Sequence, residues 1–410
     1  MQIGHNRVRK IAYTVIVMGI ILFGLSGTFM PVEGVAQSKP PIKIGILYPF
    51  TGPYTHLGVR QLRGWKLALE QVNYKVAGRP IELIVEDTKG DPSTGVTKTV
   101  KLIEQDRVHI LGGIVNSAVA YAIRDIVDQS KTPLMITLAN AGGLTRERRS
   151  PFIFRTFVPG GTGSHYMAEF IYKDLKLRKA LITASDYAYG REHAEMFKKE
   201  FEKLGGQVLF ESFVPLGSPD FGPYCSKLAD FAGKADVLHY VYSGTDAIRF
   251  VKTAEEVGLK KRFVMTEWGG MEDGYELSQV DSAAEGIYKI AFYAFGVNTK
   301  ANQRFLELDK KKGEGVDVRD YFAYIGAEVV LHALEKIKGN VEAKDSFLKA
   351  LRTIQFECPT GSFQFDARSQ NALTSLFISQ IRRVDGEFGK YQNVIIKTIP
   401  QAQDPWWFGK

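Results

Sequence analysis

The apolar positions between 42 and 73 predict a strand, a turn and a helix. Residues 42–47 are nearly all apolar and rich in isoleucine, which is typical of a strand covered on both faces, as in a parallel sheet. A Thr-Gly-Pro turn at 51–53 interrupts this run, and apolar residues then recur at the three- and four-residue steps of an amphipathic helix. Ligands of open parallel sheets bind beyond the carboxyl ends of the strands, so residues 50–58 are predicted to lie at a binding crevice.

Strand and helix patterns then alternate in two successive series, separated by a glycine-rich link at 159–164 that opens a helix. This alternation predicts βαβ units and therefore two parallel sheets with similar architecture. The strands are expected at 42–47, 81–87, 109–115 and 133–138 in the first series, and at 180–184, 207–214, 236–241 and 263–266 in the second, with helices at 96–103, 119–127, 191–204 and 247–257.

The last part of the chain is predicted to return to the first lobe and then to cross again. A strand-like run at 288–295 precedes three helical patterns, at 302–312, 321–338 and 343–351, and late strands follow at 361–366, 373–382 and 394–399. We therefore predict an α/β fold of two doubly wound parallel-sheet lobes joined by a three-segment hinge with a cleft between them. The first lobe is expected to comprise 42–158 plus 287–366, and the second 159–286 plus 373–399.

Composition supports two lobes and excludes some classes of function. A chain of 410 residues, with 45% hydrophobic and 24% charged residues, is too large for a single core. The net charge of +8 comes from scattered lysine and arginine residues, so no basic stripe indicates nucleic-acid binding.

The N-terminus has the pattern of a secretory signal. Arg7, Arg9 and Lys10 precede an uncharged run over 11–30, and small residues lead to a cleavage site after Ala36. We expect a signal peptide over 1–36 and a soluble, periplasmic or extracellular mature protein; an uncleaved membrane anchor is the alternative. Cys225 and Cys358 are the only cysteines, and because they are assigned to different lobes we expect two unpaired thiols.

The sequence offers little support for an enzyme. It contains no G-x-S-x-G, Walker-type, H-E-x-x-H or C-x-x-C motif, and its seven histidines are scattered singly. Gly161-Thr162-Gly163 approaches a dinucleotide fingerprint but lacks the third glycine. We expect a binding protein without a catalytic residue, metal or cofactor.

A series of short motifs resembles one family in order and spacing. They are the opening IKIGILYPFTGPYTHLG, Asp91-Pro92, the segment 112–117 (GGIVNS), 186–190 (DYAYG), 245–247 (TDA), 257–259 (VGL), 267–269 (EWG), 284–286 (AEG) and 361–366. Over nearly all of the mature region the chain is similar to type I periplasmic solute-binding proteins of the branched-chain amino acid (Leu/Ile/Val) class. The resemblance implies the type I two-lobe fold, hinge closure on a small ligand, and delivery to the membrane permease of an ABC transporter.

In the first lobe the resemblance implies a carboxylate site at the end of the third strand. Backbone N–H groups at Asn116 and Ser117, with the dipole of the following helix, suit a ligand carboxylate, although an ordinary helix cap is the alternative. The family also uses a loop that matches Ala139-Asn140-Ala141, where the Leu/Ile/Val binders carry a threonine in place of Ala141. Asn140 would then contribute an amide donor.

In the second lobe Glu267 matches the carboxylate that pairs with a ligand ammonium group, with a surface salt bridge as the alternative. Tyr189 matches an aromatic contact, with a core tyrosine as the alternative, and a second tyrosine of the family aligns near Tyr242 and Ser243. Together with Tyr54, Tyr187 and Trp268, these residues predict a pocket richer in aromatic surface than leucine requires.

The predicted function is that of a solute-binding component of an ABC importer that captures an amino acid of the branched-chain type or a related ligand. The alternatives are an amide or an aromatic or aliphatic carboxylic acid as ligand, or a ligand-sensing ectodomain. We expect a monomer that binds a small molecule and a permease.

Overall fold

The first sheet is built around the strand predicted at 42–47. In the computed structural model, which describes residues 39–408 except 314 and 316, this strand is β1, and parallel neighbours β3 and β4 pair with it. The isoleucines of β1 are fully buried because helices cover both faces of the sheet. The sheet order is β2-β3-β1-β4-β5-β6. Its strands are β1 (Ile42–Tyr48), β2 (Lys75–Val76), β3 (Arg79–Asp87), β4 (Ile110–Gly113), β5 (Leu134–Ile136) and β6 (Ile153–Arg155).

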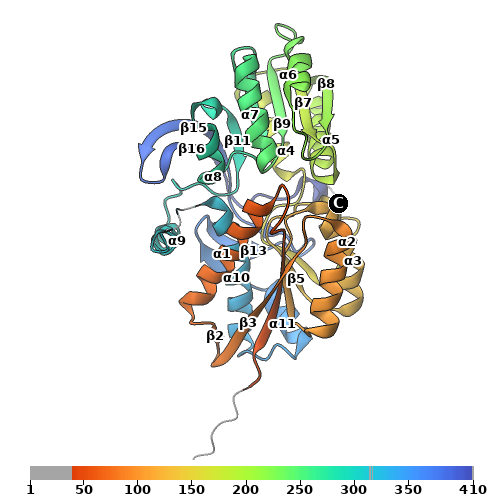
Figure 1. Cartoon of the computed structure of the whole chain (residues 1–410), viewed down its shortest axis with the longest axis vertical. Helices are drawn as coiled ribbons and strands as arrows, with labels where there is room; N and C mark the ends of the chain where they lie inside the picture. The colour runs from red at the N-terminus through yellow and green to blue at the C-terminus, as the bar shows by residue number, and fades with distance from the viewer. Residues whose placement is uncertain (1–38, 314, 316, 409–410) are drawn as a thin grey trace, which may run out of the picture. The chain divides into compact units, whose positions relative to one another are not determined.

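Two layers of helices enclose this sheet and form the first lobe with it (Figure 1). Helices α1 and α10 pack closely on each other on one side, and α2 and α3 lie on the other. At their crossing, a Cβ on Gly64 would lie 2.1 Å from the carbonyl oxygen of Asp320, so only glycine permits this approach. The helices of this lobe are α1 (Thr55–Gln71), α2 (Pro92–Val100), α3 (Ser117–Ser130), α9 (Lys300–Lys310), α10 (Val318–Lys336) and α11 (Lys344–Arg352).

The second sheet repeats the strand order of the first. Its parallel strands run β8-β7-β9-β10-β11, as β3-β1-β4-β5-β6 do in the first sheet, and the antiparallel pair β15-β16 extends one edge. In both sheets the order reverses beside the first strand, which is where such folds bind ligands. These strands are β7 (Lys179–Ser185), β8 (Gln207–Val214), β9 (Val237–Val241), β10 (Val264–Trp268), β11 (Tyr288–Ala291), β15 (Leu376–Gly386) and β16 (Gly389–Ile399).

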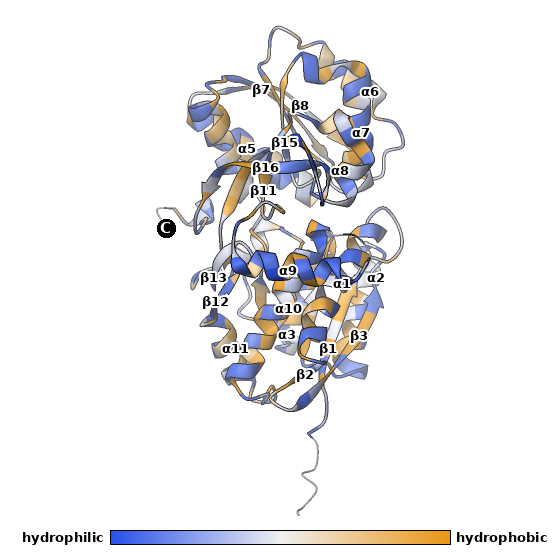
Figure 2. Ribbon diagram, turned by 90° about the vertical axis from the view of Figure 1, so that its left-hand side faces the viewer, coloured by the Kyte–Doolittle hydropathy of each residue, from blue (hydrophilic) through white to orange (hydrophobic). Residues whose placement is uncertain are grey.

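Helices also cover both faces of the second sheet and complete the second lobe. Helices α4 and α5 pack together on one face, and α6, α7 and α8 pack on the other. Figure 2 shows apolar residues along β1 in the first sheet, whereas α9 on the outside of the lobe is mostly polar. These helices are α4 (Thr162–Glu169), α5 (Ala188–Lys203), α6 (Gly222–Ala229), α7 (Thr245–Val257) and α8 (Tyr275–Val280).

The chain passes between the two lobes three times, after β6, after β11 and after β14. A small sheet, β12 (Gln355–Cys358), β13 (Gly361–Phe365) and β14 (Ala372–Leu373), lies at the last passage. The strand β11 pairs with β10 and β15 and so belongs to the second sheet, whereas the boundary expected at 287 would place it in the first lobe. Gly286 forms a tight turn with a φ of 87° before β11, and this turn leads into the sheet rather than out of it.

Other sequence predictions have mixed outcomes. Cys225 and Cys358 are both buried and unbonded, as expected. The expected signal peptide at 1–36 lies outside the described residues. Within residues 39–408, apart from 314 and 316, no helix is long and apolar enough to span a membrane.

Candidate functional site

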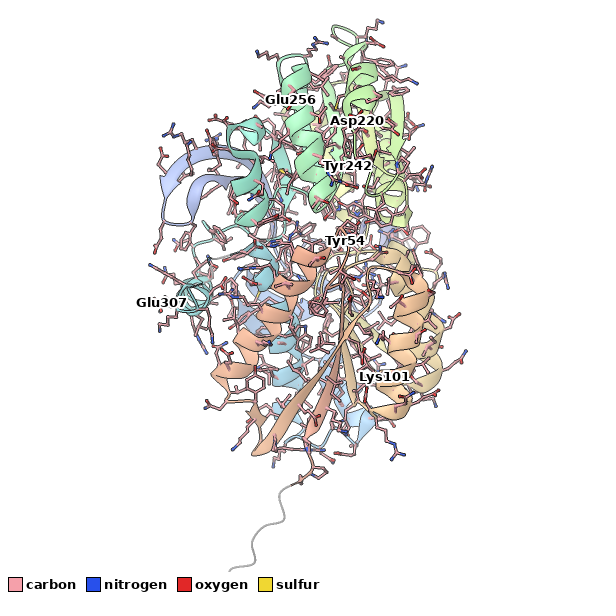
Figure 3. All side chains as sticks on the ribbon, viewed as in Figure 1. Tyr54, Lys101, Asp220, Tyr242, Glu256 and Glu307 are labelled. Carbon is pink, nitrogen blue, oxygen red and sulfur yellow. The ribbon has the colours of Figure 1, made fainter. Side chains whose placement is uncertain are left out.

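The carboxyl ends of the parallel strands of both lobes enclose one cavity of about 30 Å³. The first lobe reaches it through the segments after β1, β4 and β5, and the second through those after β7, β9 and β10, as the strand orders predict. In Figure 3, Tyr54 lies where the two lobes meet. The cavity is lined by Tyr54, Leu57, Val115, Ser117, Leu138, Asn140, Phe157, Tyr187, Tyr189, Ser243, Trp268, Gly269, Glu272 and Arg319.

The N-terminus of α3 supplies the polar part of the first-lobe wall. Asn116 caps this helix: its Oδ1 accepts from the backbone N–H of Ala118 at 2.7 Å, and its Nδ2 donates to the carbonyl of Gly90 at 3.1 Å. The side chain of Asn116 is therefore a cap that does not line the cavity, which was the alternative interpretation. Ser117, the next residue, does line it. The helix dipole there favours a negative group of a ligand.

Asn140 lies beside Ser117 in the cavity wall and carries an unused polar atom. Its side chain is 4% exposed, and its Oδ1 has no hydrogen-bond partner among the described residues. Unpartnered polar atoms are rare in protein interiors, so this atom indicates a place for a ligand or water molecule. Ala139 and Ala141 flank Asn140 but do not line the cavity; both are packed in the core beside α3.

Tyrosine side chains from both lobes close the cavity. The Tyr54 and Tyr187 hydroxyls, one from each lobe, form a hydrogen bond of 2.6 Å. Burial raises the pKa of Tyr54, Tyr187 and Tyr189 well above that of a free tyrosine, so these hydroxyls stay protonated. Tyr189 donates to the carbonyl oxygen of Trp268 at 2.9 Å, which fixes both side chains in the wall.

The indole of Trp268 is held in place by packing on several sides. Its ring lies 4.3 Å from the His193 ring and 4.6 Å, edge to face, from the Phe292 ring. A Cβ on Gly163 would come within 1.6 Å of the indole, so the start of α4 is shaped around this ring. The indole Nε1 is buried and has no acceptor among the described residues. Trp268 therefore offers a rigid apolar surface with an unused donor.

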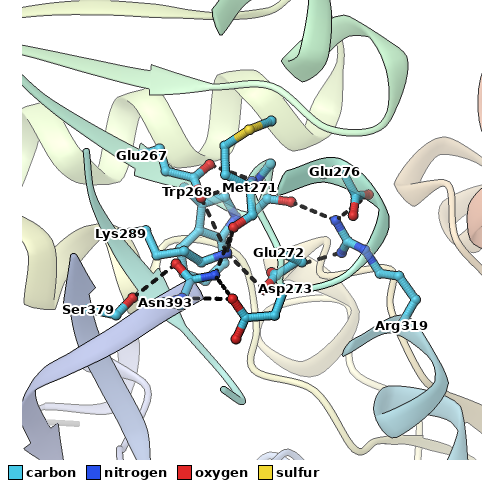
Figure 4. Close-up of polar contacts among 12 residues, drawn as sticks. Glu267, Trp268, Met271, Glu272, Asp273, Glu276, Lys289, Arg319, Ser379 and Asn393 are labelled. Atoms are coloured by element: carbon cyan, nitrogen blue, oxygen red, sulfur yellow. Dashed lines mark hydrogen bonds and ion pairs between the residues drawn. The ribbon is translucent and has the colours of Figure 1, made fainter. Parts of the chain in front are cut away.

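A cluster of buried charges adjoins the cavity, and two of its members, Glu272 and Arg319, line it (Figure 4). Lys289 Nζ lies 2.8 Å from Glu272 Oε2 and 3.2 Å from Glu267 Oε1. Arg319 comes from the first lobe, and its Nη2 lies 3.1 Å from Glu276 Oε1 and 3.2 Å from the carbonyl oxygen of Gly269. Burial raises the pKa of Glu267 and Glu276, and the neighbouring cations oppose this shift.

The structure corrects the role expected for Glu267. Its carboxylate does not line the cavity: Oε2 accepts from the N–H of Gly270 at 2.7 Å, and Oε1 accepts from the N–H of Met271 at 3.0 Å. With Lys289 as a counter-charge, Glu267 forms a buried salt bridge, so the surface salt bridge that was its alternative is wrong as well. Glu272, five residues later, is the carboxylate in the wall.

Other predicted positions divide between wall and core. Tyr54, Ser117, Asn140, Tyr189, Ser243 and Trp268 line the cavity, and that they bind a ligand stays a prediction. Tyr242 does not: its hydroxyl is bonded to that of Thr183 at 2.5 Å, and its ring packs against Phe221 and Phe250 in the second lobe. Figure 3 shows Tyr242 within that lobe, away from Tyr54.

Several residues of the wall were not predicted. Leu57, Val115, Leu138 and Phe157 lie at strand ends or in the first helix, where they resemble ordinary core residues. Glu272 and Arg319 gave no clear signal either, because each adjoins another charged residue, Asp273 and Asp320. Among the described residues no group of His, Cys, Asp and Glu has the arrangement of a metal site.

Comparisons with known proteins agree with this architecture. A model of the family described as "Periplasmic binding protein" matches residues 41–387. An ABC transporter substrate-binding protein from Sphaerobacter thermophilus has 36% identity and a TM-score of 0.83, covering 89% of this chain and 99% of its own. The solute-binding protein of an ABC transporter from Rhodopseudomonas palustris BisB5, solved in complex with 3,4-dihydroxybenzoic acid, has 26% identity, the same TM-score of 0.83 and the same coverages of 89% and 99%.

A further relative supports the same family assignment. Leu/Ile/Val-binding protein homolog 7 of Brucella abortus is 28% identical over 371 residues, which is 84% of this chain and 90% of that protein. The family match spans both lobes and the strands that bound the cavity. The chain thus belongs to the periplasmic binding protein family, as a solute-binding, non-enzymatic component of an ABC transporter that acts outside the cytoplasm.

Proposed function

We propose that the protein captures a small aromatic carboxylate between its lobes and presents it to the permease of an ABC importer. The observation that carries this proposal is the aromatic wall formed by Tyr54, Phe157, Tyr187, Tyr189 and Trp268, which surrounds the cavity from both lobes. Aromatic side chains favour offset or edge-to-face contact with another ring, so they suit a flat aromatic ligand.

The ligand carboxylate is assigned to the N-terminus of α3. Ser117 supplies a hydroxyl there, and the helix dipole favours a negative charge. The similar protein from Rhodopseudomonas palustris was solved with 3,4-dihydroxybenzoic acid, which supports this class of ligand.

A branched-chain amino acid is the second candidate. Leu57, Val115 and Leu138 give the first-lobe wall an aliphatic part that fits a leucine-like side chain. The name of the Brucella relative supports the same ligand class.

Thermal denaturation with single ligands distinguishes the two candidates. A ligand that binds only the folded protein raises the melting temperature, and at a hundred times Kd it adds about 2.7 kcal/mol of stability. We expect benzoate or a hydroxybenzoate to raise it more than leucine, isoleucine or valine at equal concentration. A larger shift with the amino acids would refute the aromatic assignment and support the second candidate.

The proposal also covers where the mature protein acts, its oligomeric state and its closure on the ligand. We place the mature protein, beginning at Gln37, outside the cytoplasm as a monomer that closes about its hinge on one ligand. Mass spectrometry of the exported protein tests the cleavage after Ala36, and an intact N-terminus would contradict it. Light scattering with and without ligand tests the monomer, and small-angle scattering tests the closure.

A further inference from the structure

The charges of the cluster that adjoins the cavity do not balance. The carboxylates of Glu267, Glu272 and Glu276 face two cations, Lys289 and Arg319, and all five side chains are buried. Lys289 is shared between Glu267 and Glu272, while Arg319 lies nearest to Glu276 (Figure 4). A buried charge without a partner is costly. One more positive charge or hydrogen-bond donor beside these carboxylates would therefore stabilise the group.

One oxygen of Glu272 is the open acceptor of the group at the cavity; Glu276 Oε2 also has no hydrogen-bond partner among the described residues, but Glu276 does not line the cavity. Oε2 is paired with Lys289 at 2.8 Å, but Oε1 lies 3.9 Å from Arg319 Nη1, beyond hydrogen-bond distance, and has no hydrogen-bond partner among the described residues. The residue is fully buried and lines the cavity. Glu267 differs, because two backbone N–H groups and Lys289 satisfy its oxygens.

Arg319 positions this acceptor. It belongs to α10 of the first lobe, yet it donates to the carbonyl of Gly269 and to Glu276, which lie on either side of Glu272 in the second lobe. Arg319 thus fixes the segment that carries Glu272 against the other lobe. In Figure 4 its guanidinium points toward Glu272 and Glu276.

We propose that the ligand carries, besides its carboxylate, a hydrogen-bond donor that Glu272 Oε1 accepts, and that this contact determines specificity. The donor is a phenolic hydroxyl on an aromatic acid or an ammonium group on an amino acid; either one can donate a hydrogen bond to Glu272 Oε1. This inference rests on the proposed solute-binding function and narrows its ligand class.

Matched pairs of ligands test the inference. One member of each pair has the donor and the other lacks it: 3- or 4-hydroxybenzoate against benzoate, and leucine against 4-methylpentanoate. Titration calorimetry is expected to show that the donor raises affinity at least about tenfold in one pair, because a charge-assisted hydrogen bond is lost without it. The pair that discriminates identifies the donor as a phenol or an ammonium group.

Two variants test whether the contact at Glu272, and not any loss of a carboxylate charge, causes the discrimination. Glu272→Gln should reduce the discrimination within that pair to less than about threefold, whereas the control Glu328→Gln, the same change at a carboxylate of α10 that does not line the cavity, should retain it. If Glu272→Gln fails to fold, Glu272→Asp, which withdraws the oxygen by one methylene, is expected to give the same loss.

Two outcomes would overturn the inference, and both leave the proposed function standing. They are equal affinity within both pairs for the unsubstituted protein, and full discrimination in the folded Glu272 variant. If no member of either pair raises the melting temperature, the proposed ligand class itself fails, which is a different result.

Discussion

The hydrogen bond between Tyr54 and Tyr187 is expected to stabilise the closed form directly. The two hydroxyls come from different lobes, lie 2.6 Å apart and are buried. In an open form both would be hydrated, so the bond exists only when the lobes are closed. Tyr54→Phe or Tyr187→Phe removes it and leaves the remaining hydroxyl buried without its partner.

The size of the effect follows from that unpaired hydroxyl. Losing a hydrogen bond and burying its former partner unsatisfied costs about 1–2 kcal/mol of closed-state stability. Where the free protein is mostly open, ligand affinity falls by the same free energy, which is about 5- to 30-fold in Kd. The double variant leaves no unpaired hydroxyl, so it should lose no more affinity than either single variant, and the two effects should be strongly non-additive.

Titration calorimetry of the four proteins measures this cycle with the best ligand from the thermal screen. Tyr242→Phe is the matched control, because its hydroxyl bonds to Thr183 inside the second lobe and does not line the cavity. It should lower the melting temperature while leaving Kd within about twofold. Additive losses in the double variant would refute the reasoning, because they would mean that each hydroxyl contacts the ligand independently.

Three further predictions follow from packing and burial. Gly163→Ala places a Cβ 1.6 Å from the Trp268 indole and should destabilise the protein by about 1–3 kcal/mol in urea denaturation; an unchanged midpoint would contradict this. Asp404→Asn breaks the buried ion pair with Arg146, at 2.8 Å, and should cost about 3–5 kcal/mol, whereas a loss under about 1 kcal/mol would count against it. Burial raises the pKa of Glu328 to about 7, so its contribution to stability is present below its unfolded pKa and is lost as pH rises through 7. Glu328→Gln should therefore raise the melting temperature at pH 8 but not at pH 4, and equal shifts at both would refute the assignment.

Much of the fold follows from local pattern. The apolar runs that predict β1 and β7 are buried on both faces, so their composition alone distinguishes them from surface segments. The short helices α6 and α8 were not predicted, because eight and six residues give too little periodicity to stand out. The strand β11 was assigned to the wrong lobe for a different reason, since the turn at Gly286 looks the same whether the chain then enters a sheet or leaves it.

The wall of the cavity was predictable where topology alone places a residue. Tyr54, Ser117 and Ser243 follow the ends of β1, β4 and β9, and the rule that ligands bind at the carboxyl ends of parallel strands is sufficient for them. Arg319 reaches the same cavity from α10, more than two hundred residues along the chain from Tyr54. No local pattern connects them, because only the packing of α10 on α1 brings that helix to the cleft.

The difference between Glu267 and Glu272 shows most clearly what could not be predicted from the sequence. After β10 the chain turns back, so that the N–H groups of Gly270 and Met271, three and four residues on, point at the Glu267 carboxylate. The turn thus satisfies the first carboxylate locally, much as a capping side chain satisfies the N–H groups at a helix start. Glu272 lies beyond the turn, has no such donors and faces the cavity with one oxygen open. The direction of the turn decides which carboxylate accepts the backbone N–H groups. Alignment by position selects Glu267, and only the backbone geometry shows that Glu272 keeps an unpaired oxygen at the cavity.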